Sequence, residues 1–596
     1  MEYKISNVLE RAVKAFDTER VPIIYDLDNK GQTKHTFSQK ELLNDIDLAW
    51  NSLYKDGKMD ADKKRKLYLN IVRFYLEVAV KNTDVDIKNF VFTPTDYSTE
   101  NKWAVWFFKR QFGTFVKDSG YGKVINDLNW SLRKYGSCVS KKVGEDVISV
   151  PIHSLKLDQK AQTLLEGVEG GTPLIEEHEF SQYQMSKFPD WEVPEDFEGK
   201  RLVHEAYLYM TTSQYMATIG KKYEEKEGDV TDDEMKLYMV IYMPSGKKEE
   251  DRRMKFEGQV LFCEEVDELP YQECHTGKQR HRWLGMGEVE KQLENQIGKN
   301  LSTNLRIRGM QWSAKNVYQK AGDPIGKSLL TQVKDGEVLE VGLNGQISRV
   351  DTQTRALGDF QQHEASFDDN SQKQSFAFES ATGESFASGT PFRMGAMLSN
   401  SVMGHFDIEK ETFAFFLKES FFKQILPIFQ SRVGKDLAII GSTDEGFNEL
   451  KELYVEIQSN EHYIKLALSP ELFTMDRIPT LDEIKQFVDS ELSKAKHLYA
   501  DIPKNVYKNA KYKIDLDITG EDRDPADKET LTTLYTNMVQ SGDPRAERVL
   551  DVLLTSMGKN LQNLAGTKQA PKPQQVNPLQ QTSQANPDLA GLVAQQ

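Results

Sequence analysis

The residues with the clearest potential for chemistry form the run GDPIGKS, from Gly322 to Ser328. In a phosphate-binding loop, backbone amides cradle the phosphates, a lysine such as Lys327 reaches them, and a serine such as Ser328 holds magnesium. Such a loop needs four residues between its glycines and a strand before it. Here three residues separate the glycines, and we expect a helix to precede the run. We therefore interpret it as a Gly/Pro loop.

Four possible metal ligands lie near one another in the sequence: Cys263, Cys274, His275 and His281. Their spacing matches no zinc finger, so we favour a structural role for them. His-Glu pairs occur at His178, His204 and His363, but each lacks the second histidine that a zinc-protease helix places four residues on. The chain also has 92 carboxylates, too many to single out an acid–base pair. We predict no cofactor and no enzymatic activity.

A basic cluster ends in an aromatic residue, and it consists of Lys278, Gln279, Arg280, His281, Arg282 and Trp283. Arginine and tryptophan are favoured anchors of protein interfaces. An exposed turn would have the same composition. Both interpretations stay open on these residues alone.

Composition limits the class of protein. The 596 residues are 38% hydrophobic and 10% aromatic, enough for several domains with buried cores. The net charge of −16 disfavours a broad basic face that grips nucleic acid. Three cysteines, without metal spacing, are typical of a reducing cytoplasm. Lys418, Glu419 and Lys423 break the most apolar stretch, 413–429, and no cationic apolar leader is present, so we expect a soluble, unsecreted chain without membrane contact.

These residues must be positioned by elements that the apolar spacing predicts. Residues 1–132 are mainly helical in this interpretation, and short strands follow at 147–157. Helical spacing returns from Leu202 to Ile219. Residues 236–283 then contain β-rich runs, which predicts a small β module between two helices.

The second of those helices, about Gly287 to Arg308, has an apolar residue at every fourth position. The stripe consists of Val289, Leu293, Ile297, Leu301 and Leu305. At about 100° per residue, it drifts by roughly 40° at each step. A narrow, spiralling stripe on a polar helix favours contact with neighbouring subunits over burial in one core.

Further along, Thr390 and Pro391 are typical of an N-cap and first helical position, and predict a long helix that Pro427 stops or kinks. Residues 512–519 alternate apolar and polar, which predicts a half-buried strand. From Lys568 onward the chain is rich in Gln, Pro and Asn and should not fold alone.

The order of several motifs resembles that of the portal proteins of tailed bacteriophages, most closely the crAss-like group. GSCV at 136–139, Val150-Pro151 and LKLD at 155–158 are similar to the portal wing. The stretch 258–283, with ELPY at 268–271, resembles the passage from the clip into GMGEV at 285–289 and a stem helix with Gln296 and Asn300. SGTPFR at 388–393 resembles the end of the tunnel loop, residues 425–429 the end of the tunnel helix, and ITGE at 518–521 a late wing strand.

The resemblance implies an α+β, mainly helical portal fold with wing, stem, clip and crown. Its expected segments are the N-terminal wing at 1–200, a stem helix at 201–228, the clip at 229–284, a stem helix at 285–312, wing at 313–377, the tunnel loop and long tunnel helix at 378–431, wing at 432–523, a helical crown at 524–567, and a flexible tail at 568–596.

It also implies a ring of twelve subunits at one capsid vertex, in the virion and, during assembly, in the host cytoplasm. The expected partners are the chain itself, the major capsid protein, the terminase large subunit, tail adaptors and the double-stranded DNA that passes through. The tunnel-loop residues would be Ser380, Gly383, Glu384, Ser385, Phe386, Ser388 and Gly389, and the clip contacts Lys278, Arg280, Arg282 and Trp283. The alternatives are a tail adaptor or internal cargo protein and, further off, a nucleotide-using enzyme.

Overall fold

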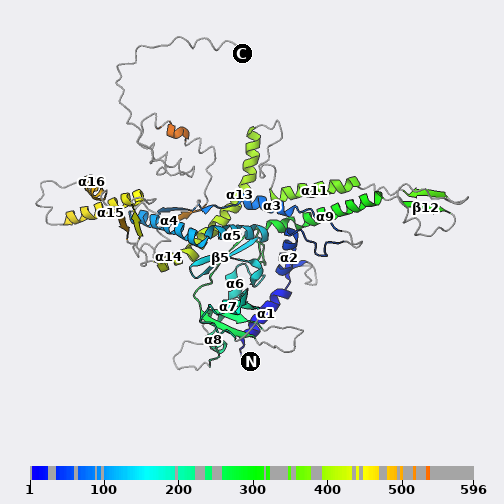
Figure 1. Cartoon of the computed structure of the whole chain (residues 1–596), viewed down its shortest axis with the longest axis horizontal. Coiled ribbons are helices and arrows are strands. Elements are labelled where there is room, and N and C mark those ends of the chain that lie inside the picture. Colours follow the sequence, from blue (N-terminus) through cyan, green and yellow to red (C-terminus); the bar gives the residue numbers. More distant parts are fainter. Residues whose placement is uncertain are drawn as a thin grey trace, which may run out of the picture. The chain divides into compact units, whose positions relative to one another are not determined.

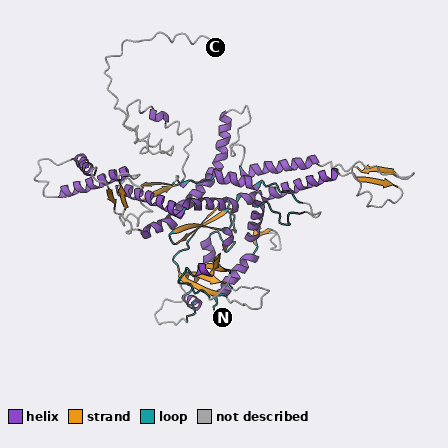
Figure 2. Cartoon of the chain, viewed as in Figure 1, coloured by secondary structure: helices purple, strands orange, loops and turns teal. Residues whose placement is uncertain are grey.

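The structure is a computed structural model of the 596-residue chain. It describes residues 3–24, 35–59, 65–87, 90–94, 99–194, 199–221, 235–244, 258–314, 317–321, 346–350, 357–376, 392–432, 438–441, 447–468, 480–492, 497–500, 514–518, 532–536 and 538. The chain divides into two units, residues 1–519 and 520–596. Helices and strands both occur throughout the larger unit, so the chain is a mixed α and β protein (Figure 2).

The N-terminal part is mainly helical, as its apolar spacing predicted. Its helices are α1 (Ile5–Thr18), α2 (Gln39–Trp50), α3 (Val72–Asn82), α4 (Thr99–Ser119) and α5 (Tyr121–Tyr135). The short strands β1 (Val21–Ile24) and β2 (His35–Phe37) pair antiparallel. Helix α5 ends at Gly136, whose φ of 80° is a left-handed conformation that glycine adopts without steric cost.

Two antiparallel sheets follow. The smaller has the order β11-β4-β5 and consists of β4 (Ser137–Val143), β5 (Asp146–Val150) and β11 (Tyr271–His275). The larger has the order β10-β9-β8-β7-β6 and consists of β6 (Leu155–Lys156), β7 (Leu174–Ser181), β8 (Lys200–Met210), β9 (Lys236–Met243) and β10 (Gln259–Glu265). Short helical segments between the strands are η2 (Ile152–Ser154), α6 (Leu164–Glu169), α7 (Gln182–Met185) and α8 (Thr212–Thr218). Strands β5, β6, β9 and β10 confirm the β-rich runs of the sequence.

The prediction of a helix from Leu202 to Ile219 is wrong. The prediction of a stem helix at 201–228, which depended on it, is therefore wrong as well. Residues 200–210 are strand β8, at the centre of the larger sheet, and only Thr212–Thr218 is helical in the described part of this segment. Four buried residues of β8 follow helical spacing: Val203, Ala206, Tyr207 and Met210. However, His204 and Leu208 between them are buried as well. Because both faces of β8 are covered, its sequence does not alternate and resembles that of a helix.

The prediction of a separate β module at 236–283 is also wrong, because its strands do not form a unit of their own. The clip expected at 229–284 depended on that module. Strand β9 pairs with β8, and β11 pairs with β4, so both join strands that precede the segment. A strand's own residues indicate its conformation but not its partner, which is why the sequence did not reveal this pairing.

Two long helices, which lie side by side in Figure 1, flank a β hairpin in the sequence. The order is α9 (Glu288–Ser313), β12 (Val317–Ala321), β13 (Gln346–Val350) and α11 (Leu357–Ser375), and the two strands pair antiparallel. The long helix expected after Pro391 is confirmed as α13 (Phe392–Ser420). It continues through a π-helical turn, Phe421–Ile425, into α14 (Leu426–Arg432). Pro427 therefore interrupts the α-helical geometry without ending the helix, because a wider turn relieves the clash of its ring with the preceding turn.

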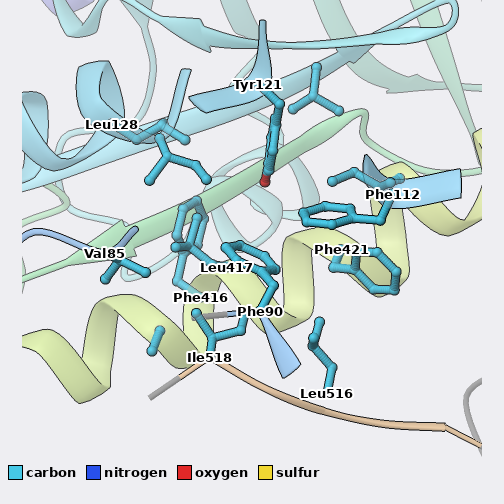
Figure 3. Close-up of a cluster of buried hydrophobic side chains, with 14 of the residues drawn as sticks. Val85, Phe90, Phe112, Tyr121, Leu128, Phe416, Leu417, Phe421, Leu516 and Ile518 are labelled. Carbon is cyan, nitrogen blue, oxygen red and sulfur yellow. The ribbon is translucent and has the colours of Figure 1, made fainter. Parts of the chain in front are cut away.

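The main apolar core joins elements from both ends of the larger unit (Figure 3). Phe112 of α4 and Tyr121 of α5 pack with Phe421, at ring distances of 6.3 Å from Phe112 to Tyr121 and 5.8 Å from Phe112 to Phe421. Leu516 belongs to β16 (Ile514–Asp517), the strand that alternation predicted, and β16 pairs with β3 (Val91–Pro94). The apolar stretch 413–429 is thus core rather than a membrane segment.

The remaining elements of the larger unit are α15 (Phe447–Leu468), α16 (Leu481–Leu492), and the pair β14 (Ala438–Gly441) with β15 (His497–Ala500). None of the described helices has the length and apolarity that a bilayer span requires. In the smaller unit, residues 532–536 are helical. Apart from residue 538, the rest of the expected crown lies outside the described residues, as does the whole of the expected tail.

Candidate functional site

The α9–α11 hairpin is the candidate site, because α9 carries the apolar stripe that the sequence predicted to be an interface. The two helices run antiparallel. Near the start of α9, the Gln292 side chain donates to the carbonyl of Ser371 at 3.1 Å. Near its end, Arg306 pairs with Glu364 at 3.1 Å. Figure 1 shows the two helices side by side along their length.

The seam between these helices is polar. Asn295 donates to Gln374 at 2.8 Å, and Lys299 pairs with Asp368. Gly298 permits the close approach, since a Cβ there would lie 2.5 Å from the Phe367 ring. Among its described residues, α11 fully buries only Ser371 and Ser375. The hairpin is therefore held by hydrogen bonds, ion pairs and one close contact rather than by an apolar core.

A second side of α9 binds the extended segment 66–71 through three side-chain amides. Asn304 accepts from the Leu67 N–H and donates to the Leu67 carbonyl, both at 2.9 Å. Asn300 accepts from the Leu69 N–H at 2.9 Å, and Gln296 from the Ile71 N–H at 2.8 Å. Four helical residues rise about 6 Å and two extended residues about 6.6 Å, so the repeats match.

Sequence reasoning missed this amide ladder, which consists of Gln296, Asn300 and Asn304. A signal was present, because amide side chains recur at every fourth position of the helix from Gln292 to Asn304. The extended partner segment has no comparable signal.

The apolar stripe of α9 divides into two parts. Val289 is fully buried in its own chain, in a cluster with residues of α2, α3 and α13, and Leu293 packs against that cluster. For Val289 the predicted inter-subunit role is therefore wrong. Ile297, Leu301 and Leu305 are 59%, 61% and 39% exposed. The drift of the four-residue stripe explains the division, because each step turns it further from the core.

The exposed part of the stripe lines a groove of about 630 Å³. Further apolar lining comes from α2, through Leu48 and Ala49, and from Leu53, Tyr54 and Tyr68 in the chain between α2 and α3. Ion pairs stand beside it, with Lys66 2.6 Å from Asp56 and Lys55 3.2 Å from Asp45. The groove thus has an apolar lining and a charged border, the composition of a surface that binds another chain.

The basic cluster at 278–283 is not the exposed anchor that the sequence allowed. Trp283 is fully buried, and its indole N–H donates to Glu273 at 2.7 Å. Arg282 is buried and makes two hydrogen bonds to Glu290, at 2.8 and 2.6 Å. The Lys278 ammonium donates to the Trp283 carbonyl at 2.7 Å, and Arg280 is exposed. For Arg282 and Trp283 the predicted partner contact is wrong, because these side chains already have partners within the chain.

Three glycines fix the start of α9 against the end of α5. A Cβ at Gly285 would lie 2.1 Å from the Gly136 carbonyl oxygen, and a Cβ at Gly287 would lie 2.6 Å from the Gly136 nitrogen. The backbones approach so closely that no side chain fits at these positions. The GMG motif is therefore required by packing.

A buried charge network also holds this end of α9. Arg133 of α5 pairs with Glu409 of α13, and Lys291 of α9 lies 2.6 Å from Glu288. Burial raises the pKa of Glu288, and the Lys291 charge opposes that rise. The first turn of α9 is thus anchored in the core, while its C-terminal half extends beyond it.

Glu176, His178 and Glu205 are the one group in the described part of the chain with three potential metal-ligand atoms within 4.8 Å. The Lys141 ammonium lies 2.7 Å from Glu176 and 2.6 Å from Glu205, and so already occupies the cation position. Burial alone would raise the pKa of Glu205, but the hydrogen bond with His178 and the charge of Lys141 outweigh it and lower the pKa to about 2. The group joins β4 to β7 and β8 and does not resemble a metal centre.

The other candidate ligands and loops have different outcomes. Cys263 lies on β10 and Cys274 on β11, in different sheets, so these cysteines do not form the zinc site that we disfavoured. The GDPIGKS run lies outside the described residues. A strand, β12, precedes it, so the expectation of a helix there is wrong, while the spacing of its glycines still departs from a phosphate loop. The seven tunnel-loop residues, Ser380, Gly383, Glu384, Ser385, Phe386, Ser388 and Gly389, also lie outside the described residues.

No family model matches the chain, and no curated protein matches it.

Proposed function

We propose that this chain is the portal protein of a tailed bacteriophage, one subunit of a twelve-membered ring through which viral DNA is packaged and ejected. The observation that carries the proposal is the exposed stripe of Ile297, Leu301 and Leu305 beside its groove. A helix anchored at one end, with large apolar side chains exposed along the rest, is typical of a surface that another chain covers. The order of portal-like motifs in the sequence supports the same proposal.

The proposed stem and clip shift along the chain from the boundaries first expected. A portal clip lies between two stem helices, and the described order that fits is α9, then β12 and β13, then α11. We therefore assign α9 and α11 to the stem and the two strands to the clip. We assign helix α13 to the tunnel helix, and we assign residues 378–389 to the tunnel loop.

In this proposal the protein is not an enzyme and acts mechanically in the virion. The terminase large subunit would dock on the clip during packaging, tail adaptors would replace it, and the major capsid protein would surround the ring. A net charge of −16 supports a conduit, because few cations are left to hold DNA phosphates as the duplex passes.

Electron microscopy of the purified full-length chain tests the proposal. We expect closed rings with an axial channel, and native mass spectrometry should give one dominant assembly of twelve chains. A monomer, or an open filament, at every concentration examined would overturn the proposal.

The interface itself is tested by Leu301→Asp. A charge placed in a contact between chains costs several kcal/mol when it is unpaired. We expect loss of rings with no change in the thermal unfolding midpoint of the monomer, since Leu301 is exposed there. The matched control is Leu165→Asp on α6, a leucine that is 46% exposed outside the hairpin, and it should assemble as the unmodified chain does. Intact rings from the Leu301 variant would exclude the stripe as the interface.

A further inference from the structure

Two of the three cysteines stand directly opposite each other on neighbouring strands. Cys138 of β4 is in register with Cys274 of β11. The Thr276 N–H bonds the Gly136 carbonyl at 2.9 Å, which identifies 136 and 276 as a hydrogen-bonded pair, and alternation makes 138 and 274 another. The Cα atoms of such a pair are about 5.5 Å apart, within the range of about 4.4–6.8 Å that disulfides span.

Their side chains share one buried environment. Cys138 is fully buried, Cys274 nearly so, and both belong to the core cluster that contains Phe421. The two thiols are free, and the neighbouring Cys274 thiol adds to the effect of burial in raising the pKa of Cys138. Directly opposite residues of an antiparallel pair point to the same face, so the sulfurs can meet without any change of register. The third cysteine, Cys263, is on β10 in the other sheet.

We propose that Cys138 and Cys274 are a redox-sensitive pair, which is a dithiol in reducing surroundings and closes into a β4–β11 disulfide when the chain meets a small-molecule disulfide. One thiolate attacks that oxidant and releases its first thiol, leaving a mixed disulfide on the protein. The second cysteine thiolate then attacks the mixed disulfide and releases the second thiol. The protein loses two protons and two electrons, and the oxidant gains them.

The oxidant can reach the buried thiols when strand β11 opens, because β11 is an edge strand. Among the strands that the structure describes, β11 is at the edge of its sheet and pairs with β4 alone. Burial holds the pKa of the Cys138 thiol well above its usual range, so thiolate is scarce while the strand stays closed. Oxidation should therefore be slow, and opening of the β11 edge should limit its rate.

The closed pair would constrain a large part of the chain. All five strands of the larger sheet lie between residues 138 and 274 in sequence. A disulfide across so long a loop stabilises mainly by restricting the unfolded chain. We expect the thermal unfolding midpoint to rise on oxidation and to return on reduction. The proposal does not depend on the proposed function, because pairing within one chain requires no ring.

The test incubates the folded full-length chain with oxidised glutathione, blocks free thiols at acid pH, and maps peptides by mass spectrometry without reduction. We expect a linked peptide pair containing Cys138 and Cys274, in the unmodified chain and in Cys263→Ser alike. Cys138→Ala should give no such link and no oxidation-dependent shift in the unfolding midpoint. If Cys138→Ala does not fold, the linkage map and the midpoint shift of Cys263→Ser decide alone. Free thiols or glutathione adducts at both positions, with no link, would overturn the proposal.

Discussion

In the core around α5 and α13, Phe112, Tyr121 and Phe421 pack ring against ring, and apolar contacts from distant segments close around them. The α9–α11 hairpin has a different character: amides, serines and ion pairs form most of its seam, beside the ring of Phe367. The large apolar side chains of Ile297, Leu301 and Leu305 are exposed. The core is complete within one chain. The hairpin is not, because Ile297, Leu301 and Leu305 stay exposed in this chain.

The largest expected effect comes from a substitution in the apolar core around α5 and α13. Phe421→Ala removes a fully buried ring from the core and should lower the free energy of unfolding by about 3–5 kcal/mol. Phe415→Ala on the same helix is the control, since this side chain is 58% exposed and should matter far less. Urea titration followed by circular dichroism measures both. Equal losses from the two variants would mean that the apolar core is not what stabilises this region.

The sequence predicted the core better than the hairpin, for a physical reason. Apolar spacing indicated α13 and the strand β16 because each has one buried face with a clear period. The same spacing predicted a helix where β8 lies, because β8 is buried on both faces. The prediction for Arg282 and Trp283 was wrong because tertiary packing sets their partners, Glu290 and Glu273. The amide ladder depends on the match between the rise of four helical residues and that of two extended residues. The helix and the extended segment are far apart in sequence, so no local pattern indicates that they pair.

A smaller effect is expected from pH, because the two regions of the molecule should differ in how their stability depends on it. Glu205 has its pKa lowered to about 2 in the folded chain, although burial alone would raise it, because of the His178 hydrogen bond and the charge of Lys141. A group with a lowered folded-state pKa stabilises the protein above its unfolded-state pKa, near 4.5, and that stability is lost as the pH falls from there to about 2. The loss should be about 3 kcal/mol.

Unfolding measured between pH 5 and pH 2 tests this sign. Glu205→Gln should show a shallower fall in the free energy of unfolding over that window, because its amide does not titrate. The amide ladder of α9 does not titrate either, so hydrogen exchange at 67–71 should change less with pH than exchange in β7 and β8, after correction for intrinsic rates. The same pH slope in both proteins would contradict the assignment of the lowered pKa to Glu205.

The smallest effect tests whether polar contacts hold the incomplete region. Asn300→Ala removes the acceptor for the Leu69 N–H and leaves that donor partly buried without its partner, at a cost of about 1–3 kcal/mol. The amide of Leu69 should then exchange about fivefold to a hundredfold faster, since about 1.4 kcal/mol corresponds to a factor of ten. Gln362→Ala, at an exposed position of α11, is the matched control and should leave that amide unchanged. The expected change is local, because Gln296 and Asn304 still hold the segment on either side. If Leu69 kept its protection in the Asn300 variant, the ladder would be a consequence of the packing of segment 66–71 and not its cause, and the groove wall beside the exposed stripe would owe its position to Tyr54 and Tyr68 instead.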